Sequence, residues 1–543
     1  MASNNVAKVL KLTLNQYFES TSLDGYKFFI ELKGQTVQRC VWGLILLVNF
    51  AFSIYIVSYA WQTFTSNPTI TTLESQEYPI WNVPFPAVAI CSVNKFSLKA
   101  VKQYVQELKM KMFNSTTESQ LMESMLLLGS MYDIGSANSD DAASFQNVLD
   151  YYDSNKDDGF YDIRSVMEKL APKCEDFMLK CQWLGEDREC KSLFTLEATS
   201  DGFCCTFNYE RFKYKYTQST LLKTNLTGAS KGLIVLLNGT TSDYFYSNRN
   251  TLGFAVQLFS PGNFPDGTTG NLREYILNPG REVYLKLLVT TEKSMNTIRP
   301  YGINQRKCLF KDEKSQEYGD HYSYPECLTK CKLRSIYALC NCIPFYAPSD
   351  FKISDDNRMH CTLADVKCLE RYRVTWNTYK PQGAGREGFE REQEDSLNCP
   401  DCLPLCSTTS YNFETTSSEI QTKGSARTSW GLLKGLDNLT DVSLLRIYYS
   451  TTASVLYKTD VLYTWYEILG NFGGLLGLGL GFSIISFVEL IYFLTVKVCV
   501  NRAQLAKQVV PIPRKRNRMG LLNNGGNERG KANKNMPQFD YLE

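Results

Sequence analysis

The chain has 543 residues, a formal net charge of +2 and 18 cysteines. Its length is sufficient for several domains, and its near-neutral charge offers no basic excess that would suggest nucleic acid as a partner. There is also no acidic excess of the kind that keeps a chain disordered, so the local distribution of apolar residues and cysteines is more informative than the overall composition.

The first strongly apolar stretch, Val41–Trp61, contains no charged residue. Its length matches a helix that crosses a hydrocarbon core of about 30 Å. A signal peptide is excluded because the stretch is long, starts well inside the chain and lacks a small-residue cleavage site. We predict a transmembrane helix over residues 40–61, preceded by a cytoplasmic segment, 1–39. A buried helix of a soluble protein is the alternative.

Sixteen of the cysteines lie between Cys91 and Cys406, whereas Cys40 and Cys499 sit at the edges of apolar stretches. An even number of cysteines, dense in one bounded segment, predicts disulfides formed in an oxidising compartment.

Zinc binding is the alternative for part of this set, because Cys399 and Cys402 have the CxxC spacing of a zinc ribbon. However, Cys327 and Cys331 are spaced CxxxC, and the whole chain has only 2 histidines. We therefore predict disulfides and no metal site.

Sequons for N-glycosylation occur only between the two apolar stretches. Their asparagines are Asn114, Asn225, Asn238 and Asn438. Together with the cysteines, they predict that residues 62–465 form a large, disulfide-rich extracellular domain.

The second apolar stretch runs from about Leu469 to Val496, and Glu489 is its only charged residue. It is crowded with glycine, at Gly470, Gly473, Gly474, Gly477, Gly479 and Gly481. Glycine allows close helix packing, and it permits non-helical backbone where that backbone lines a water-filled path. Backbone carbonyls and the Ser483 hydroxyl could then replace part of an ion's hydration shell.

A carboxylate such as that of Glu489 costs roughly 2.5–3.5 kcal/mol at the centre of a membrane helix, so it usually faces a bundle interior or water. We predict that residues 466–500 form a second, pore-lining transmembrane helix. A glycine-rich helix dimer with a snorkelling glutamate is the alternative.

Basic residues flank the two stretches on the sides away from the intervening domain. They are Lys8, Lys11, Lys27, Lys33 and Arg39 before the first, and Lys497, Arg502, Lys507, Arg514, Lys515, Arg516 and Arg518 after the second. The positive-inside rule therefore predicts that both termini are cytoplasmic. The tail, 501–543, is polar and predicted to be disordered, and its basic cluster suits contact with anionic membrane lipid better than a nuclear signal.

Ordered motifs run through most of the chain. They are Phe85-Pro-Ala-Val-Ala-Ile-Cys91-Ser-Val-Asn-Lys-Phe96, Gly202-Phe-Cys204-Cys205-Thr-Phe-Asn208, Gly232-Leu-Ile-Val-Leu-Leu-Asn238, Arg306-Lys-Cys308, Cys327-Leu-Thr-Lys-Cys331, Leu339-Cys340-Asn-Cys342-Ile-Pro-Phe345, Cys399 to Cys406, and Gly473 to Leu490. In this order they resemble the degenerin and epithelial sodium channel superfamily, which includes the acid-sensing channels. The Gly-Phe-Ser run and the paired cysteines are most similar to the arthropod pickpocket branch of amiloride-sensitive sodium channel subunits.

The resemblance implies an α+β membrane protein with two transmembrane helices and a large extracellular hand of palm β-sheet, β-ball, finger, knuckle and thumb. It also implies a plasma-membrane homo- or heterotrimer of related subunits, with a pore lined by the three second helices. Sodium is then the permeant ion, no cofactor is needed, and the stimulus is an extracellular ligand or a mechanical force.

The same resemblance assigns roles within the second span. It places the selectivity filter at Gly481-Phe482-Ser483. Gly470 matches the position where bulky residues hold degenerins open, and Gly474 matches the blocker site. Asn471 and Glu489 are the remaining pore-associated residues.

The resemblance also implies disulfide pairings. They are Cys308–Cys406, Cys327–Cys402, Cys331–Cys399, Cys340–Cys368 and Cys342–Cys361 in the thumb, and Cys91–Cys204 and Cys181–Cys190 elsewhere, with the remaining Cys174 and Cys205 joined to each other. Such a ladder would stiffen the thumb as a lever between a distal sensor and the pore.

One motif departs from the family. Where the family has a His-Gly pair before the first span, this chain has Asp24-Gly25. The glycine still permits the turn, and three Asp24 carboxylates near the inner mouth would attract cations. A solvated or helix-capping aspartate is the alternative for Asp24. The departure also leaves a non-conducting accessory subunit of a heteromer as an alternative function.

Other functions are less well supported. No metalloprotease, Walker or kinase motif is found, so we predict that the chain is not an enzyme. An ATP-gated trimeric channel would need a different cysteine pattern, whereas a membrane receptor or adhesion protein without a pore stays open. Two histidines give little support to proton sensing, and the acidic finger region around Asp140 and Asp150–Asp158 is either a solvated loop or an acid sensor. We expect ligand specificity in the finger or nearby.

Overall fold

The computed structural model describes residues 2–31, 36–112, 117–135, 138–153, 161–210, 221–270, 272–314, 322–349, 351, 360–380, 394–420, 432–433 and 441–508. The chain divides into two compact units, one containing residues 1–62 and 465–543 and the other residues 63–464. The limits of the second unit lie within one residue of the domain expected over 62–465.

The first unit is helical. It contains α1 (Ala2–Ser20), α2 (Phe28–Glu31), most of α3 (Thr36–Ser66), α16 (Trp465–Leu480), α17 (Ile484–Tyr492), the π-helical turn η11 (Phe493–Lys497) and α18 (Val498–Gln508). Two stretches, Thr36–Ser66 and Ile484–Gln504, are long and apolar enough to cross a membrane. A core helix of a soluble protein would bury most of its surface, but only 6% of the apolar window in α3 is buried. Lipid is therefore the environment that suits it.

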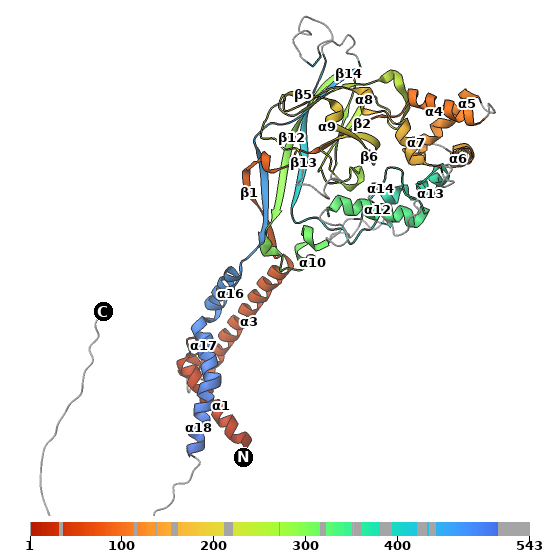
Figure 1. The fold of residues 1–543 in the computed structure, drawn as a ribbon. Helices are drawn as coiled ribbons and strands as arrows, with labels where there is room; N and C mark the ends of the chain where they lie inside the picture. Colours follow the sequence, from red (N-terminus) through yellow and green to blue (C-terminus); the bar gives the residue numbers. More distant parts are fainter. Residues whose placement is uncertain are drawn as a thin grey trace, which may run out of the picture. The chain divides into compact units, whose positions relative to one another are not determined.

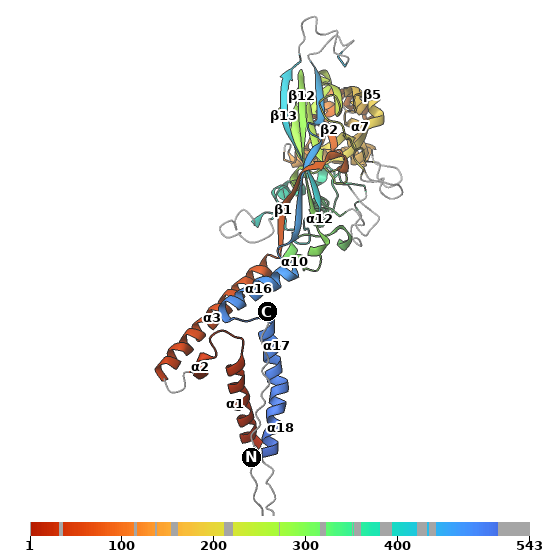
Figure 2. The same ribbon diagram turned by 90° about the vertical axis from the view of Figure 1, so that its left-hand side faces the viewer.

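The second apolar stretch is not the single helix expected over 466–500. Helix α16 ends at Leu480 and α17 begins at Ile484, which leaves a non-helical gap of Gly481, Phe482 and Ser483. Figure 2 shows α16 and α17 running in different directions on the two sides of this gap. The physical reason lies in the glycine and serine of the gap, as described below.

The second unit is built on two β-sheets. An eight-stranded sheet has the order β1 (Thr69–Pro79), β15 (Ala453–Val461), β12 (Arg281–Ser294), β14 (Val442–Tyr449), β8 (Leu233–Asn238), β4 (Met178–Trp183) and β5 (Glu186–Arg188), with β13 (Thr408–Glu419) paired to β12. A five-stranded sheet has the order β11 (Arg273–Leu277), β10 (Phe254–Phe259), β2 (Ala87–Ser92), β7 (Gly202–Phe207) and β6 (Phe194–Thr199). A third, two-stranded sheet pairs β3 (Asn94–Ser97) with β9 (Tyr244–Ser247).

The long strand β12 organises the larger sheet. Along one edge it runs parallel to β14 and then to β15, and along the other it pairs antiparallel with β13. Strand β8, with the sequence Leu-Ile-Val-Leu-Leu-Asn, is buried at its first five positions, as expected of an interior strand that is apolar on both faces. The resemblance to a palm strand at this segment is thus matched by its central place in the sheet.

The main core contains residues from both sheets together with Phe85. The Phe85 ring is fully buried and makes edge-on contacts with Trp183, Phe207 and Tyr449. Burial of large aromatic side chains supplies much of the stability of such a core.

Helices lie beside the strands, and Figure 1 shows two groups of them, α4–α7 and α12–α14, on one side of the sheets. They are α4 (Leu98–Lys111), α5 (Glu118–Met125), η2 (Leu126–Met131), α6 (Ser139–Asp153), α7 (Ile163–Leu170), α8 (Cys174–Phe177), α9 (Cys190–Leu193), α10 (Ile303–Arg306), α12 (Tyr324–Cys340), η9 (Leu363–Asp365), α13 (Val366–Arg371) and α14 (Arg373–Asn377). The first group and η9 share one apolar core with α13 and α14. Helix α12 begins with Ser323 as its N-cap and ends at Asn341 in the left-handed conformation.

Candidate functional site

The gap in the second span depends on Gly481 and Ser483. Gly481 has a φ of +65°, a left-handed conformation that L-residues with a side chain rarely adopt. Ser483 is extended and caps α17, because its hydroxyl accepts a hydrogen bond from the Ser486 amide at 3.2 Å. The sequence Gly-Phe-Ser therefore ends one helix and begins the next within the second apolar stretch.

A turn at residues 21–25, which we call the pre-span loop, lies against this gap. A Cβ atom added to Gly481 would lie 2.7 Å from Asp24 Cγ and 2.8 Å from the Asp24 backbone nitrogen. Gly25 has a φ of +82°, and its carbonyl accepts a hydrogen bond of 2.7 Å from Trp42 Nε1 in the first span. The inner-mouth residues and the filter residues expected from the sequence are therefore brought together.

Two helices at the ends of the chain support the pre-span loop. The Asn501 side chain on α18 is 1% exposed and donates hydrogen bonds to Thr13 Oγ1 at 2.9 Å and Gln16 Oε1 at 3.0 Å on α1. The rings of Tyr17 and Phe493 pack edge to face nearby. Figure 2 shows α1 running alongside α18, so the loop that follows α1 is held beside the second span.

Glu489 is tied to the same loop. Its Oε2 accepts hydrogen bonds from both the backbone nitrogen and the hydroxyl of Ser22, each at 3.0 Å. Ser22 Oγ also lies 2.8 Å from Ser486 Oγ, and Ser486 is fully buried. Ser22 and Ser486 were not among the site residues predicted from the sequence. The i, i+3 spacing of Ser483, Ser486 and Glu489 could have indicated Ser486, because it places the three on one face of a helix.

The glycines of α16 have different surroundings. Gly479 packs so closely on Ser53 of α3 that an added Cβ atom would overlap the Ser53 hydroxyl. Gly470, Gly473 and Gly474, in contrast, have no neighbouring atom within 4 Å of an added Cβ, and Asn471 is also exposed. Gly470 and Gly474 are four residues apart and so share a face of the helix that nothing in the described part of the chain covers.

The second unit contains the seven disulfides that the resemblance implied and the eighth, which joins the two remaining cysteines. They are Cys91–Cys204, Cys174–Cys205, Cys181–Cys190, Cys308–Cys406, Cys327–Cys402, Cys331–Cys399, Cys340–Cys368 and Cys342–Cys361. Cys399 and Cys402 belong to two different bridges, so the zinc-ribbon alternative is wrong. Cys40 and Cys499 are free.

The bridges at 327–402 and 331–399 lie close together in a small core. Two turns of α12 supply one cysteine to each, and the 399–402 segment supplies the other. The Tyr322 hydroxyl joins the two segments again, since it donates to the Leu403 carbonyl at 2.6 Å and accepts from the Leu403 amide at 3.0 Å. This part of the second unit is covalently braced.

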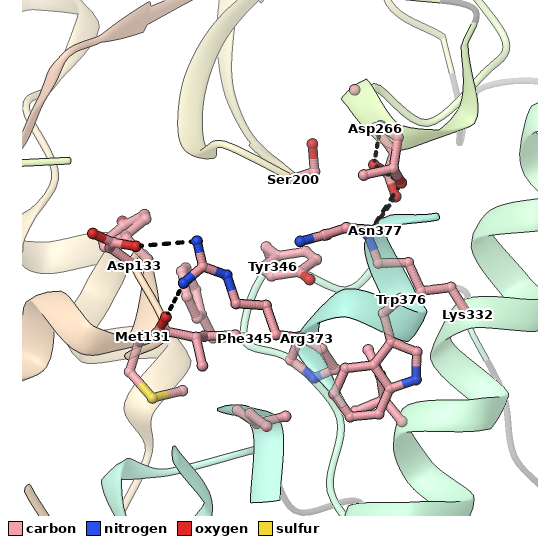
Figure 3. A pocket seen from close by; sticks show the side chains of 17 residues that line it. Met131, Asp133, Ser200, Asp266, Lys332, Phe345, Tyr346, Arg373, Trp376 and Asn377 are labelled. Atoms are coloured by element: carbon pink, nitrogen blue, oxygen red, sulfur yellow. Dashed lines mark hydrogen bonds and ion pairs between the residues drawn. The ribbon is translucent and has the colours of Figure 1, made fainter. Parts of the chain in front are cut away.

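The second unit also contains a cavity of about 280 Å³ between η2, α12 and α14 (Figure 3). Tyr132, Phe345, Tyr346 and Trp376 are among its aromatic lining residues. Arg373 extends toward Asp133, with Nη2 3.7 Å from a carboxylate oxygen, and donates to the Ile134 carbonyl at 2.5 Å.

A second charged pair in the cavity wall is buried. Lys332 Nζ lies 3.2 Å from Asp266 Oδ2 and 3.2 Å from Thr268 Oγ1, and the two charged side chains are 8% and 2% exposed. Burial by itself lowers the pKa of Lys332, because it disfavours the charged amine. The interactions with Tyr346 and Asp266 have the larger effect, so the pKa of Lys332 lies above its ordinary value of 10.5. The cavity therefore combines aromatic surface with fixed charges of both signs.

Two of the expected glycosylation sites lie in the described part of the chain. Asn225 is exposed, whereas Asn238 is half-buried at the end of β8, where its Oδ1 accepts a hydrogen bond from the Thr240 amide. Asn114 and Asn438 lie outside the described residues. Glycosylation at these sites stays a prediction.

Irregular backbone at membrane depth is tolerated only where protein buries it or where it lines a water-filled path, and polar groups line this gap. The architecture therefore defines a two-span membrane protein of the channel type. The chain belongs to the amiloride-sensitive sodium channel family, and the match extends over residues 17–493. The resemblance drawn from the motifs is confirmed, and the family consists of ion channels, not enzymes.

Named relatives agree with this assignment. The chain is 25% identical to pickpocket protein 28 of Drosophila melanogaster, over 95% of this chain and 86% of that protein. It is 22% identical to the sodium channel protein Nach of Drosophila ananassae, over 90% of this chain and 87% of that protein. Pickpocket protein 11 of Drosophila melanogaster is 24% identical, over 93% of this chain and 80% of that protein.

Proposed function

We propose that this chain is a subunit of a trimeric, sodium-selective and amiloride-sensitive cation channel of the plasma membrane, with both termini in the cytoplasm. Three copies of the second span, from this chain alone or from related subunits, surround the pore. The observation that carries the proposal is the gap at residues 481–483, against which the pre-span loop packs. Sodium is the permeant ion, and the channel needs no cofactor.

Gly481-Phe482-Ser483 is the proposed selectivity filter. The gap places backbone carbonyls and the Ser483 hydroxyl outside regular helix, where oxygen atoms can take the place of water around a cation. Asp24 and Gly25 lie beside this segment and would line the inner mouth. An acidic side chain there raises the local cation concentration.

The uncovered face of α16 supports the assignments of Gly470 and Gly474. Because nothing in the described chain covers these glycines, neighbouring subunits or a blocker can approach them closely. Gly470 is the proposed gate position and Gly474 the proposed blocker site, with Asn471 between them.

An extracellular ligand is the proposed stimulus, and the aromatic, charged cavity of the second unit supports it. Mechanical force is the second candidate, favoured by the disulfide bracing, which would transmit displacement without loss. The acidic finger segment lies partly outside the described residues, 154–158 among them.

Voltage clamp of cells that express the full chain tests the proposal. We expect an inward current that falls when external sodium is replaced by a large organic cation and that amiloride blocks. The chain should be expressed alone and together with related subunits, because Asp24 replaces the family histidine and favours an accessory role as the second candidate function. A chain that reaches the surface and changes no current in any combination would instead support a receptor or adhesion protein without a pore.

A further inference from the structure

Three serines and one glutamate form a continuous hydrogen-bonded chain from the filter to the pre-span loop. Ser483 Oγ lies 3.1 Å from Ser486 Oγ, which lies 2.8 Å from Ser22 Oγ, which lies 3.0 Å from Glu489 Oε2. The first two and Glu489 belong to the second span, whereas Ser22 belongs to the segment before the first span. Two parts of the chain separated by more than 450 residues thus share one polar network.

The number of hydrogens and lone pairs on each group determines which group donates and which accepts in each hydrogen bond of this network. A hydroxyl has one hydrogen to donate and two lone pairs that accept. Glu489, as a carboxylate, can only accept, so Ser22 donates its hydroxyl hydrogen to Glu489. Ser22 Oγ can then only accept from Ser486.

The same reasoning about donors and acceptors assigns the hydrogen bonds of Ser486 and Ser483. Ser486 has donated to Ser22, so it accepts from the Ser483 hydroxyl at 3.1 Å and from the Ser483 amide at 3.2 Å. Ser483 Oγ accepts only one bond within the network, from the Ser486 amide. Its hydrogen points toward Ser486, and one lone pair has no donor among the residues that the structure describes.

We infer that Ser22 and Glu489 orient the Ser483 hydroxyl so that it presents an oxygen lone pair, rather than a hydrogen, to the permeant cation. Ser22 is thus a positioning residue for ion selectivity that acts from the cytoplasmic side of the first span. The inference rests on the proposed function, since it assumes that Ser483 lines the conduction path.

The variant Ser22→Ala isolates this role. It removes the hydroxyl but leaves the Ser22 backbone nitrogen, which still donates to Glu489 and keeps the loop attached. A hydrogen bond of this kind contributes about 0.5–1.5 kcal/mol. If its loss removes that preference for sodium, the sodium-to-potassium permeability ratio should fall about two- to tenfold. Ser22→Thr keeps the hydroxyl and should retain the ratio. Ser20→Ala is the matched control, because the Ser20 hydroxyl bonds to the Gln16 carbonyl outside the network.

Glu489→Gln tests the direction of the network. An amide NH₂ group can donate to Ser22, which permits the chain of hydroxyls to reverse and turn the Ser483 hydrogen toward the ion. We expect the same loss of selectivity as in Ser22→Ala, and the double variant should be no worse than either single variant, because both break one network.

A chemical test reports the contact independently of current. In full-length protein that carries Cys40→Ser and Cys499→Ser, the pair Ser22→Cys and Ser486→Cys should form a disulfide on mild oxidation, so that both thiols lose reactivity toward maleimide added after denaturation. Persistently reactive thiols contradict the contact and overturn the inference. If Ser22→Ala and Glu489→Gln both conduct with an unchanged permeability ratio, the inference is wrong but the proposed function stands. A wild-type chain that conducts in no subunit combination overturns the proposed function as well.

Discussion

Asp24 lies directly against Gly481, with the Asp24 backbone nitrogen 2.8 Å from the position that a Cβ atom of residue 481 would occupy. A residue before the first span thus forms one wall of the gap in the second span. The contact explains why position 481 requires glycine on two grounds, the φ of +65° and the absence of space for a side chain.

Gly481→Ala should abolish sodium-selective current while the protein still reaches the cell surface. The left-handed backbone costs a residue with a side chain roughly 1–2 kcal/mol, and the new methyl group would also displace Asp24. Current per surface-biotinylated subunit measures the effect. Gly262→Ala is the matched control, because an added Cβ there meets no atom within 4 Å and needs no unusual φ. Normal selectivity in Gly481→Ala would contradict the role given to the gap.

Asp24→Asn should lower single-channel conductance. The reduction should be larger at low ionic strength, because the Debye length is about 30 Å at 0.01 M salt and about 10 Å at 0.1 M. Recordings at both concentrations measure this difference. Asp24→His restores the family residue and should also alter current or ion preference. If Asp24→His leaves both unchanged, Asp24 has no role at the inner mouth.

Removal of the Cys331–Cys399 bridge should lower thermal stability and weaken gating. The bridge closes a loop with a sequence separation of 68, which corresponds to about 4 kcal/mol in the chain-entropy description. The double variant Cys331→Ser with Cys399→Ser is compared with Cys499→Ser, which removes a free cysteine. Melting of the purified protein and stimulated current are the readouts. Unchanged gating and surface expression would show that the braced segment is no lever.

Asp266→Asn should destabilise the second unit because it leaves the Lys332 charge buried without its partner. Breaking a buried pair in this way costs about 3–5 kcal/mol, whereas replacing both partners with uncharged residues costs much less. The double variant Asp266→Asn with Lys332→Met should therefore recover most of the lost melting temperature. Equal losses in the single and double variants would mean that the pair contributes no electrostatic coupling.

The second unit should lose stability as the pH rises above about 10. Burial, reinforced by the Asp266 charge, raises the pKa of Tyr379 from 10.0 to about 12. Burial also raises the pKa values of Tyr104 and Tyr449. In this pH range the unfolded chain has lost phenolic protons that the folded chain keeps, so the free energy of unfolding falls with rising pH.

Melting temperatures between pH 8 and pH 11, together with the ultraviolet absorbance of phenolate, measure this loss. Tyr379→Phe should make the decline shallower, since it removes one of the contributing groups. A flat stability profile up to pH 11 would show that these phenols ionise as readily in the folded chain as in the unfolded chain.

The sequence alone was sufficient to predict the membrane spans and the disulfide-rich domain between them. The uncharged stretch Val41–Trp61 can cross a membrane only as a helix, since a helix satisfies its own backbone hydrogen bonds in lipid. The motifs around the cysteines indicated the family and, through it, seven disulfide pairings, which left Cys174 and Cys205 to form the eighth. The structure contains all eight.

Only the tertiary structure decided how the second span is built. Hydropathy is the same for a continuous helix as for a broken one. The glycines of 466–500 permitted non-helical backbone, but the sequence did not fix where the helix breaks, which the structure places at Gly481–Ser483. Hydrogen bonds between residues more than 450 positions apart leave no local pattern, so Ser22 was missed although Glu489 was not. The sequence determines which segments enter the membrane, whereas packing of the pre-span loop against the gap decides which oxygen atoms there take part in hydrogen bonds.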